Sequence, residues 1–140
     1  MTPSASPPPP EGRSPLAAWG GRLLSGLAIL FLLADGAIKL IPLQPVTDTM
    51  QALGWPTDPW LLRTLGVIQI AATLIYANPQ SAVFGAILLT AYLGGAVASH
   101  LRIGSPLLTH TLFGVYVGAV LWAGLWVRSP ALREVLYGKR

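Results

Sequence analysis

Residues 64–101 read TLGVIQIAATLIYANPQSAVFGAILLTAYLGGAVASHL and contain no aspartate, glutamate, lysine or arginine. This uncharged run is too long for one crossing of a bilayer, because about 20 apolar residues span a hydrocarbon core of about 30 Å. Its middle, NPQS at residues 78–81, consists of residues that favour a turn. The run therefore predicts two transmembrane helices, near residues 60–77 and 81–101.

Two further apolar runs flank this stretch. The first covers residues 19–41 and is interrupted by Arg22 near its start and by Asp35 and Lys39 near its end. The second covers residues 107–127 and, apart from one histidine, carries no ionisable acidic or basic side chain. Each run approaches the length of a membrane span, which brings the predicted number of spans to four.

The links between the predicted helices determine their arrangement. Residues 78–81 join the second helix to the third, and residues 102–106 join the third to the fourth. Links this short make neighbouring helices antiparallel. We therefore predict an all-α fold, an integral membrane four-helix up-down bundle with a short interfacial helix between helices one and two.

That short helix is predicted within residues 42–59. Val46, Met50 and Leu53 recur at the spacing of one helix face, while the residues between them are mostly polar. Pro45 and Gly54 lie where helix starts and ends favour proline and glycine. We expect the helix to lie at the membrane interface, anchored at head-group level by the tryptophans at positions 55 and 60.

A signal peptide is the alternative reading of the first apolar run. Arg13 and Arg22 would form its basic flank, and Ala34-Asp35-Gly36 loosely resembles a cleavage site. Because three further spans follow, a retained first helix is the better interpretation.

The composition agrees with a membrane protein. The chain has 140 residues, of which 53% are hydrophobic and only 10% are charged, whereas a soluble domain carries about 25% charged residues. Its net charge of +4 comes from basic residues outside the apolar runs, so it indicates topology rather than nucleic-acid binding. The chain has no cysteine, which excludes disulfides and cysteine-ligated zinc or iron–sulfur clusters.

The predicted domain organisation is simple. Residues 1–15 are rich in proline and predict a disordered cytoplasmic tail, since they cannot bury enough apolar surface to fold. Residues 16–136 form the four-helix membrane domain, and residues 137–140 form a basic C-terminal tail.

The basic residues also predict the orientation of the chain. One side of the membrane would hold both termini with Arg13, Arg22, Arg128, Arg133, Lys139 and Arg140. The other side would hold Lys39, Arg63 and Arg102, with Asp48 and Asp58 beside them. Because cytoplasmic loops carry an excess of lysine and arginine, both termini are predicted to be cytoplasmic, in a bacterial inner membrane.

Polar side chains within or beside the spans are the candidate functional residues, because they are costly in lipid. By the alternating direction of the helices, most of them fall near the outer leaflet. We predict that they line a ligand-binding pocket whose members are Asp35, Lys39, Arg63, Gln69, Tyr92, His100, Arg102 and His110.

Structural explanations of the same residues stay open. Asp35 and Lys39 are four residues apart on one helix face, so they could neutralise each other, or they could form an inter-subunit contact. Small and polar residues also recur along helices two to four, and such stripes more often serve close helix packing than ligand binding.

The two histidines invite a comparison with metal and haem sites. Both lie beside one short link instead of facing each other across a bundle core, and zinc needs three or four ligands. We therefore predict no metal site and no haem. Hydrolase nucleophile arrangements and phosphate-binding loops are absent, so no catalytic residue is predicted and enzymatic activity is left open.

Several motifs together resemble the DoxX-like membrane proteins. They are LLADGAIKL in the first run, LGWP at residues 53–56, RTLG at residues 63–66 and, most specifically, the stretch GAILLTAYLGGAVASHLRIGSPLLTHTLFGVYVGAVLWAGLW at residues 85–126. The similarity extends over residues 19–136. It implies a small four-helix membrane protein, and Asp35, Lys39, Tyr92, His100, Arg102 and His110 match recurrent features of that family.

The resemblance also implies a range of functions. The family takes its name from a subunit of thiosulfate:quinone oxidoreductase, although most DoxX-like proteins have no assigned activity. We expect an accessory or subunit-like protein; the alternatives are a quinone-interacting oxidoreductase subunit and a small-solute or lipid transporter. The expected partners are the bilayer, a membrane or redox protein and a second copy through glycine-rich helix faces. No resident cofactor is expected other than a bound quinone.

Overall fold

The computed structural model describes residues 15–41 and 43–138, in which helices alternate with short links and no strand occurs. The all-α prediction is confirmed. The elements in chain order are α1 (Pro15–Leu40), α2 (Gln44–Ala52), α3 (Pro59–Ala77), α4 (Ala82–Arg102), the π-helix η1 (Leu107–Thr111), α5 (Phe113–Arg128) and α6 (Pro130–Tyr137). The predicted disordered tail, except Pro15, and the last two residues of the predicted basic tail lie outside the described residues.

Four helical stretches are long and apolar enough to cross a membrane, as predicted. They are Trp19–Leu40, Pro59–Ala77, Ala82–Arg102 and Leu107–Arg128, the last of which joins η1 to α5. Large apolar side chains such as Leu27, Ile68 and Phe84 are exposed on their outer surfaces. Because a water-soluble fold would bury most of these side chains, lipid is the solvent that fits this surface.

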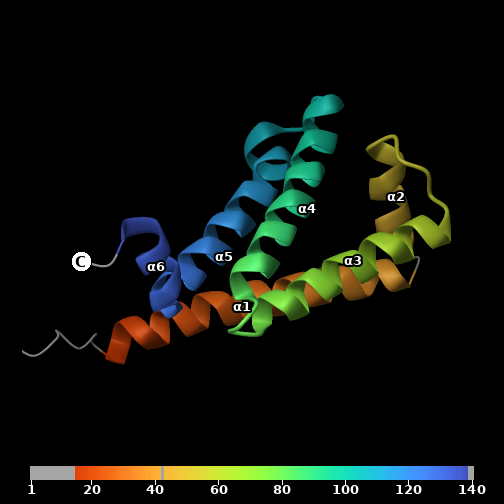
Figure 1. Ribbon diagram of the computed structural model, residues 1–140. Helices are drawn as coiled ribbons and strands as arrows, with labels where there is room; N and C mark the ends of the chain where they lie inside the picture. The colour runs from red at the N-terminus through yellow and green to blue at the C-terminus, as the bar shows by residue number, and fades with distance from the viewer. Residues whose placement is uncertain (1–14, 42, 139–140) are drawn as a thin grey trace, which may run out of the picture.

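The four spans alternate in direction. Both α1 and α4 pack against α3 and α5. Two contacts show that α1 and α3 are antiparallel. The Leu40 carbonyl at the end of α1 accepts a hydrogen bond from Arg63 at the start of α3, and Ser25 in the first part of α1 contacts Tyr76 at the end of α3. Figure 1 shows α1 and α3 running together, with α4 and α5 rising from them at an angle as a second pair.

The largest cluster of buried hydrophobic side chains lies in one half of the molecule, which we call the closed end. It is formed by the middle of α1, the second half of α3, the first half of α4 and the second half of α5, and includes Leu32, Ala86 and Leu121. The buried Tyr76 hydroxyl lies 2.8 Å from the Leu121 carbonyl, to which it donates, and 3.1 Å from the Ser25 hydroxyl. One side chain of α3 thus ties α1 and α5 together.

Glycines permit the closest helix contacts of the closed end. A Cβ added to Gly85 of α4 would overlap the backbone of Tyr76 in α3. A Cβ added to Gly124 of α5 would lie 2.6 Å from the Ser25 hydroxyl oxygen and 2.7 Å from the Ser25 nitrogen. Such contacts allow membrane helices to approach backbone to backbone, so these two glycines serve packing within the chain.

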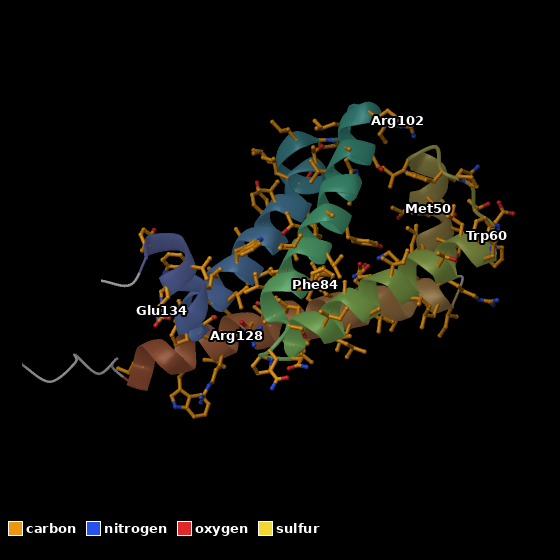
Figure 2. All side chains as sticks on the ribbon, viewed as in Figure 1. Met50, Trp60, Phe84, Arg102, Arg128 and Glu134 are labelled. Atoms are coloured by element: carbon orange, nitrogen blue, oxygen red, sulfur yellow. The ribbon has the colours of Figure 1, made fainter. Side chains whose placement is uncertain are left out.

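The opposite half, the open end, comprises the end of α1, α2, the start of α3, the end of α4 and η1. The short helix predicted between the first two spans is present here as α2. Its apolar stripe faces inward, however, because Met50 and Leu53 are buried. Figure 2 shows Met50 on the inner side of α2 and Arg102 at the end of α4 nearest to it.

Two hydrogen bonds fasten the link that follows α2 to the end of α4. The Trp55 indole nitrogen donates to the Ser99 hydroxyl at 3.1 Å, and the Arg102 guanidinium donates to the Leu53 carbonyl. Trp55 therefore has a protein partner, whereas Trp60 at the start of α3 is 67% exposed, as suits an interfacial anchor.

The final helix, α6, was not predicted as a separate element. It begins where the Ser129 side chain accepts a hydrogen bond from the Leu132 nitrogen at 3.3 Å, with a proline at the first helical position. Leu132 joins the core, and Tyr137 packs edge-on against Trp126 at 5.3 Å between ring centroids. So short a helix depends on these contacts for its stability.

Candidate functional site

The open end encloses a cavity of about 600 Å³ between α1, α2, α4 and the segment formed by η1 and α5. Most of its wall is apolar. The apolar lining includes Phe31, Leu32, Ile38, Val46, Met50, Leu53, Leu93, Val97, Phe113 and Val117. The three residues of the α2 stripe are among them, so α2 forms one wall of this open-end cavity.

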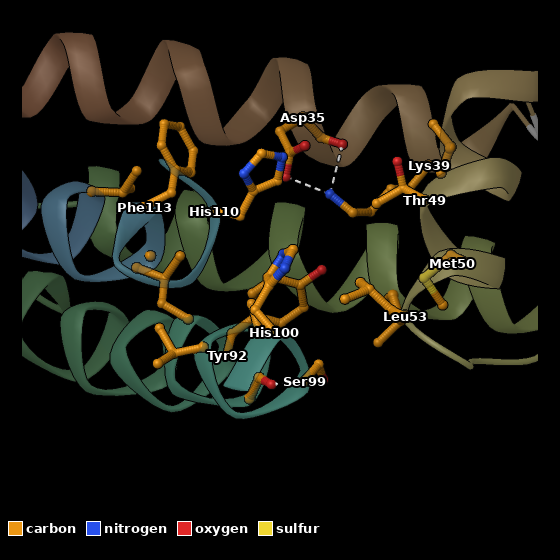
Figure 3. Close-up of a pocket in the computed structure, with 18 of the residues that line it drawn as sticks. Asp35, Lys39, Thr49, Met50, Leu53, Tyr92, Ser99, His100, His110 and Phe113 are labelled. Atoms are coloured by element: carbon orange, nitrogen blue, oxygen red, sulfur yellow. Dashed lines mark hydrogen bonds and ion pairs between the residues drawn. The ribbon is translucent and has the colours of Figure 1, made fainter. Parts of the chain in front are cut away.

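Polar side chains are grouped on this wall. Figure 3 shows Asp35 and Lys39 on the α1 side of the cavity, His100, Tyr92 and Ser99 on the α4 side, and His110 between the two. The alternating direction of the spans brings these positions, which are distant in sequence, to one end of the molecule. Five of the eight residues predicted for a ligand site therefore line a single cavity.

A compact hydrogen-bond network holds the α1 side of the cavity to α3. Lys39 forms an ion pair with Asp35 Oδ2, and it also donates to the Asp35 carbonyl and to Gln69 Oε1, both at 3.2 Å. The Gln69 amide nitrogen donates to Asp35 Oδ2 at 2.8 Å and to the Leu32 carbonyl at 2.9 Å. Gln69 is fully buried, so it positions Asp35 and Lys39 from behind and does not itself line the cavity.

Two polar atoms on the cavity wall keep unused hydrogen-bonding capacity. Within residues 15–41 and 43–138, neither Asp35 Oδ1 nor the Tyr92 hydroxyl takes part in a hydrogen bond, and neither atom is completely buried. Buried polar atoms in proteins are nearly always paired, so accessible unpaired atoms in an apolar cavity are the natural contacts of a ligand.

The two histidines lie side by side on the cavity wall. Their ring centroids are 6.0 Å apart, with the planes inclined at 59°. His100 Nδ1 is paired with the Ser105 hydroxyl at 3.0 Å and His110 Nδ1 with the Thr109 hydroxyl at 2.8 Å, which leaves Nε2 of each ring for other contacts. No group of three or more histidine, cysteine or acidic side chains that could hold a metal ion occurs in the described part of the chain.

His110 lies on the π-helix η1, which distorts the start of the fourth span. The Thr111 and His110 nitrogens both donate to the Pro106 carbonyl at 3.1 Å, and the buried Thr111 hydroxyl donates to the Ser105 carbonyl at 3.2 Å. Single turns of π-helix are frequent at functional sites. Here the turn presents His110 to the cavity next to His100.

Two predicted site residues lie at the open end but outside the cavity. Arg63 is exposed, and its Nε donates to the Leu40 carbonyl at 3.3 Å, so it satisfies the C-terminal end of α1. Arg102 reaches the Leu53 carbonyl and fastens α4 to the link after α2. The cavity therefore contains Asp35 but not Arg63, whose long side chain turns toward the surface.

The predicted packing stripes serve contacts inside the chain. Gly66 of α3 lies against α1, and Gly114 of α5 lies against Leu93 and Val97 of α4. By contrast, Gly95 lines the cavity, and no atom lies within 4 Å of the position that a Cβ would occupy there. The structural explanation therefore holds for the first two glycines and not for the third.

Other cavity residues were not assigned to the site from the sequence. They come chiefly from α2, including Val46, Thr49 and Met50, and from the aromatic pair Phe31 and Phe113, whose rings pack edge-on at 5.6 Å. The signal available for α2 was its apolar stripe, which fits a cavity wall as well as a membrane surface. No comparable signal distinguishes Phe31 or Phe113 from apolar residues that face lipid.

The chain matches one family described as the DoxX-like family over residues 23–124. The match extends from the first half of α1 into α5, and it includes every polar residue of the cavity named above. Searches of curated proteins and of solved structures gave no match.

Proposed function

The chain belongs to the DoxX-like family, and from that premise we propose that it is an accessory, subunit-like protein of the bacterial inner membrane that binds a quinone-type lipid in its open-end cavity. The observation that carries this proposal is the combination of an apolar cavity of about 600 Å³ with a small group of polar atoms on facing walls. Ligand pockets typically measure about 300–1,000 Å³ and combine apolar walls with a few polar groups that orient the ligand.

The side chains of the cavity wall suit a ligand that has a flat, neutral head group and an apolar tail. Asp35 and Lys39 neutralise each other, so the cavity offers hydrogen bonds without a net charge from this pair. Tyr92 and His100 lie opposite, His110 lies between the two sides, and the Phe31–Phe113 pair adds aromatic surface. The ring of a quinone or a hydroquinone has polar oxygen groups at opposite edges and apolar faces, which suits a cavity with polar groups on facing walls and apolar surface between them.

The redox chemistry of such a ligand would belong to a partner protein. The chain has no cysteine for a thiol or an iron–sulfur centre. We therefore assign to the chain the binding and orientation of the ligand, and to a membrane or redox partner the transfer of electrons.

Filling the cavity tests the proposed function. Gly95→Leu places a side chain inside the cavity, whereas Gly94→Leu places the same side chain on the same helix outside the cavity lining, and neither position has an atom within 4 Å of a Cβ. After purification in mild detergent, lipid extracts analysed by mass spectrometry should show co-purifying quinone with the wild-type and Gly94→Leu proteins. Gly95→Leu should retain roughly tenfold less, a loss of about 1.4 kcal/mol in binding free energy.

Equal quinone content in the two glycine variants, or no quinone with the wild-type protein, would contradict the proposal. A protein that co-purifies with wild type would identify the partner, and its retention by Gly95→Leu would show that the partner binds elsewhere than in the cavity.

The orientation is part of the same proposal and has a separate test. The closed end carries Arg22, Arg128 and Arg133, so the positive-inside rule favours a cytoplasmic closed end and an open end at the outer leaflet. A reporter fused after Ser81 should be active in the cytoplasm, and one inserted near Ser105 should be active on the opposite side. The reverse activities would place the cavity at the inner leaflet.

A further inference from the structure

The donors on the α1 side of the open-end cavity are all in use. The Lys39 ammonium has three N–H groups, and three acceptors surround it: the Asp35 carboxylate, the Asp35 carbonyl and Gln69 Oε1. The Gln69 amide has two N–H groups, which point to the Leu32 carbonyl and the Asp35 carboxylate. Neither side chain has a donor left for a ligand.

One acceptor on this side remains. Asp35 Oδ2 accepts hydrogen bonds from both Lys39 and Gln69, whereas Oδ1 accepts none from any described residue and is not completely buried. A ligand atom that faces Asp35 must therefore donate a hydrogen bond. An ether or carbonyl oxygen in that position would face a carboxylate oxygen with no proton between them.

The opposite side of the cavity does not impose this requirement. The Tyr92 hydroxyl can donate or accept, and Nε2 of a neutral histidine can do either according to the tautomer. Only the α1 side fixes the polarity of the head group. It also disfavours anions, because the charge of Lys39 is paired and both Arg63 and Arg102 are engaged with backbone carbonyls outside the cavity.

We propose that the cavity selects a neutral amphiphile whose head group carries a hydroxyl, and that this hydroxyl donates a hydrogen bond to Asp35 Oδ1. The inference rests on the proposed function and specifies it, since a hydroquinone has such a hydroxyl and the corresponding quinone does not. A hydroxylated lipid such as diacylglycerol presents the same chemistry, so the test includes both sources.

Binding of matched probes to the purified full-length chain in detergent micelles tests the inference. The probes are a short-tailed naphthohydroquinone kept reduced under anaerobic conditions, the corresponding naphthoquinone, the dimethyl ether of the hydroquinone, and dioctanoylglycerol with its methyl ether. Because a hydrogen bond to a charged acceptor is stronger than one between neutral groups, the hydroquinone should bind about ten- to a hundredfold more tightly than the quinone and the dimethyl ether.

Asp35→Asn sharpens the test. Lys39 can bond to the amide oxygen of the new side chain, which turns an N–H group toward the cavity, so the preference for hydroquinone over quinone should disappear or reverse. Arg63→Gln lies outside the cavity and should keep the wild-type preference. Thermal unfolding of each variant shows whether it is folded. If Asp35→Asn does not fold, the affinities of the wild-type protein for the probe series decide whether the cavity selects a hydroxyl.

The outcomes separate the two proposals. Equal affinity of hydroquinone, quinone and dimethyl ether would overturn hydroxyl selection and leave quinone binding intact. Binding of dioctanoylglycerol but not of its methyl ether, with no binding of the naphthalene compounds, would uphold hydroxyl selection and overturn the quinone class. No binding of any probe would overturn both.

Discussion

Replacing Gly85 by alanine should destabilise the protein by about 3 kcal/mol, the upper part of the usual range for an overpacked contact. The added Cβ would overlap the backbone nitrogen and Cα of Tyr76 and lie 2.8 Å from the Ile75 carbonyl carbon. Backbone atoms cannot rotate aside as a side chain can, so α3 and α4 must separate. Reversible denaturation in mixed detergent micelles, followed by circular dichroism, measures the loss.

Gly94→Ala is the matched control on the same helix. No atom lies within 4 Å of the position that its Cβ would occupy. Replacing a helical glycine by alanine also removes backbone entropy from the unfolded chain, so the stability of this variant should equal or slightly exceed that of wild type. Equal losses for the two variants would show that the cost arises from the helix itself and not from the contact with Tyr76.

The ion pair of the open end should give the second large effect. Lys39→Met should destabilise the protein by about 2–3 kcal/mol, less than for a fully buried pair, since removing one partner of a partly buried pair leaves the other charge without its counterion. Asp35 and Gln69 would lose the ammonium group that both contact. The same denaturation experiment measures the change.

A double variant separates the charge from the packing. Lys39→Met combined with Asp35→Leu removes both charges and adds apolar contacts, so it should recover most of the lost stability, as replacing both partners of an ion pair with apolar residues often does. The double-mutant cycle then gives the coupling energy of the pair. A double variant as unstable as Lys39→Met alone would mean that the contacts of Lys39 other than the ion pair dominate.

The sequence was sufficient to predict the spans and α2. The predicted span 60–77 differs from α3 by one residue at its start, and the predicted span 81–101 differs from α4 by one residue at each end, because turn residues and the charge-free run leave little choice of boundary. The direction of the apolar stripe of α2 was not predictable, because periodicity shows which helix face is apolar but not whether that face contacts lipid or the rest of the protein. The stripe faces inward in the structure, where Ser99 and Arg102 of α4 form hydrogen bonds with the link that follows α2.

The sequence predicted which residues of the site lie at the same end of the molecule, but not which of their side chains point into the cavity. Alternating spans bring Asp35, Tyr92 and His110 to one end of the molecule, and hydropathy alone establishes that alternation. Whether a side chain there points inward depends on the rotation of each helix about its axis, which the apolar pattern of a lipid-exposed helix barely constrains. Arg63 and Gln69 illustrate the difference, since they share α3 but reach the surface and the interior, respectively.

The Tyr76 hydroxyl has a mechanical consequence. It fastens α1, α3 and α5 where the core is dense, whereas the opposite half is joined across α2 and α4 by only the two hydrogen bonds of Trp55 and Arg102 among the described residues. At the open end the two helix pairs meet through the Phe31–Phe113 ring contact, so the closed end holds them together more firmly than the open end does.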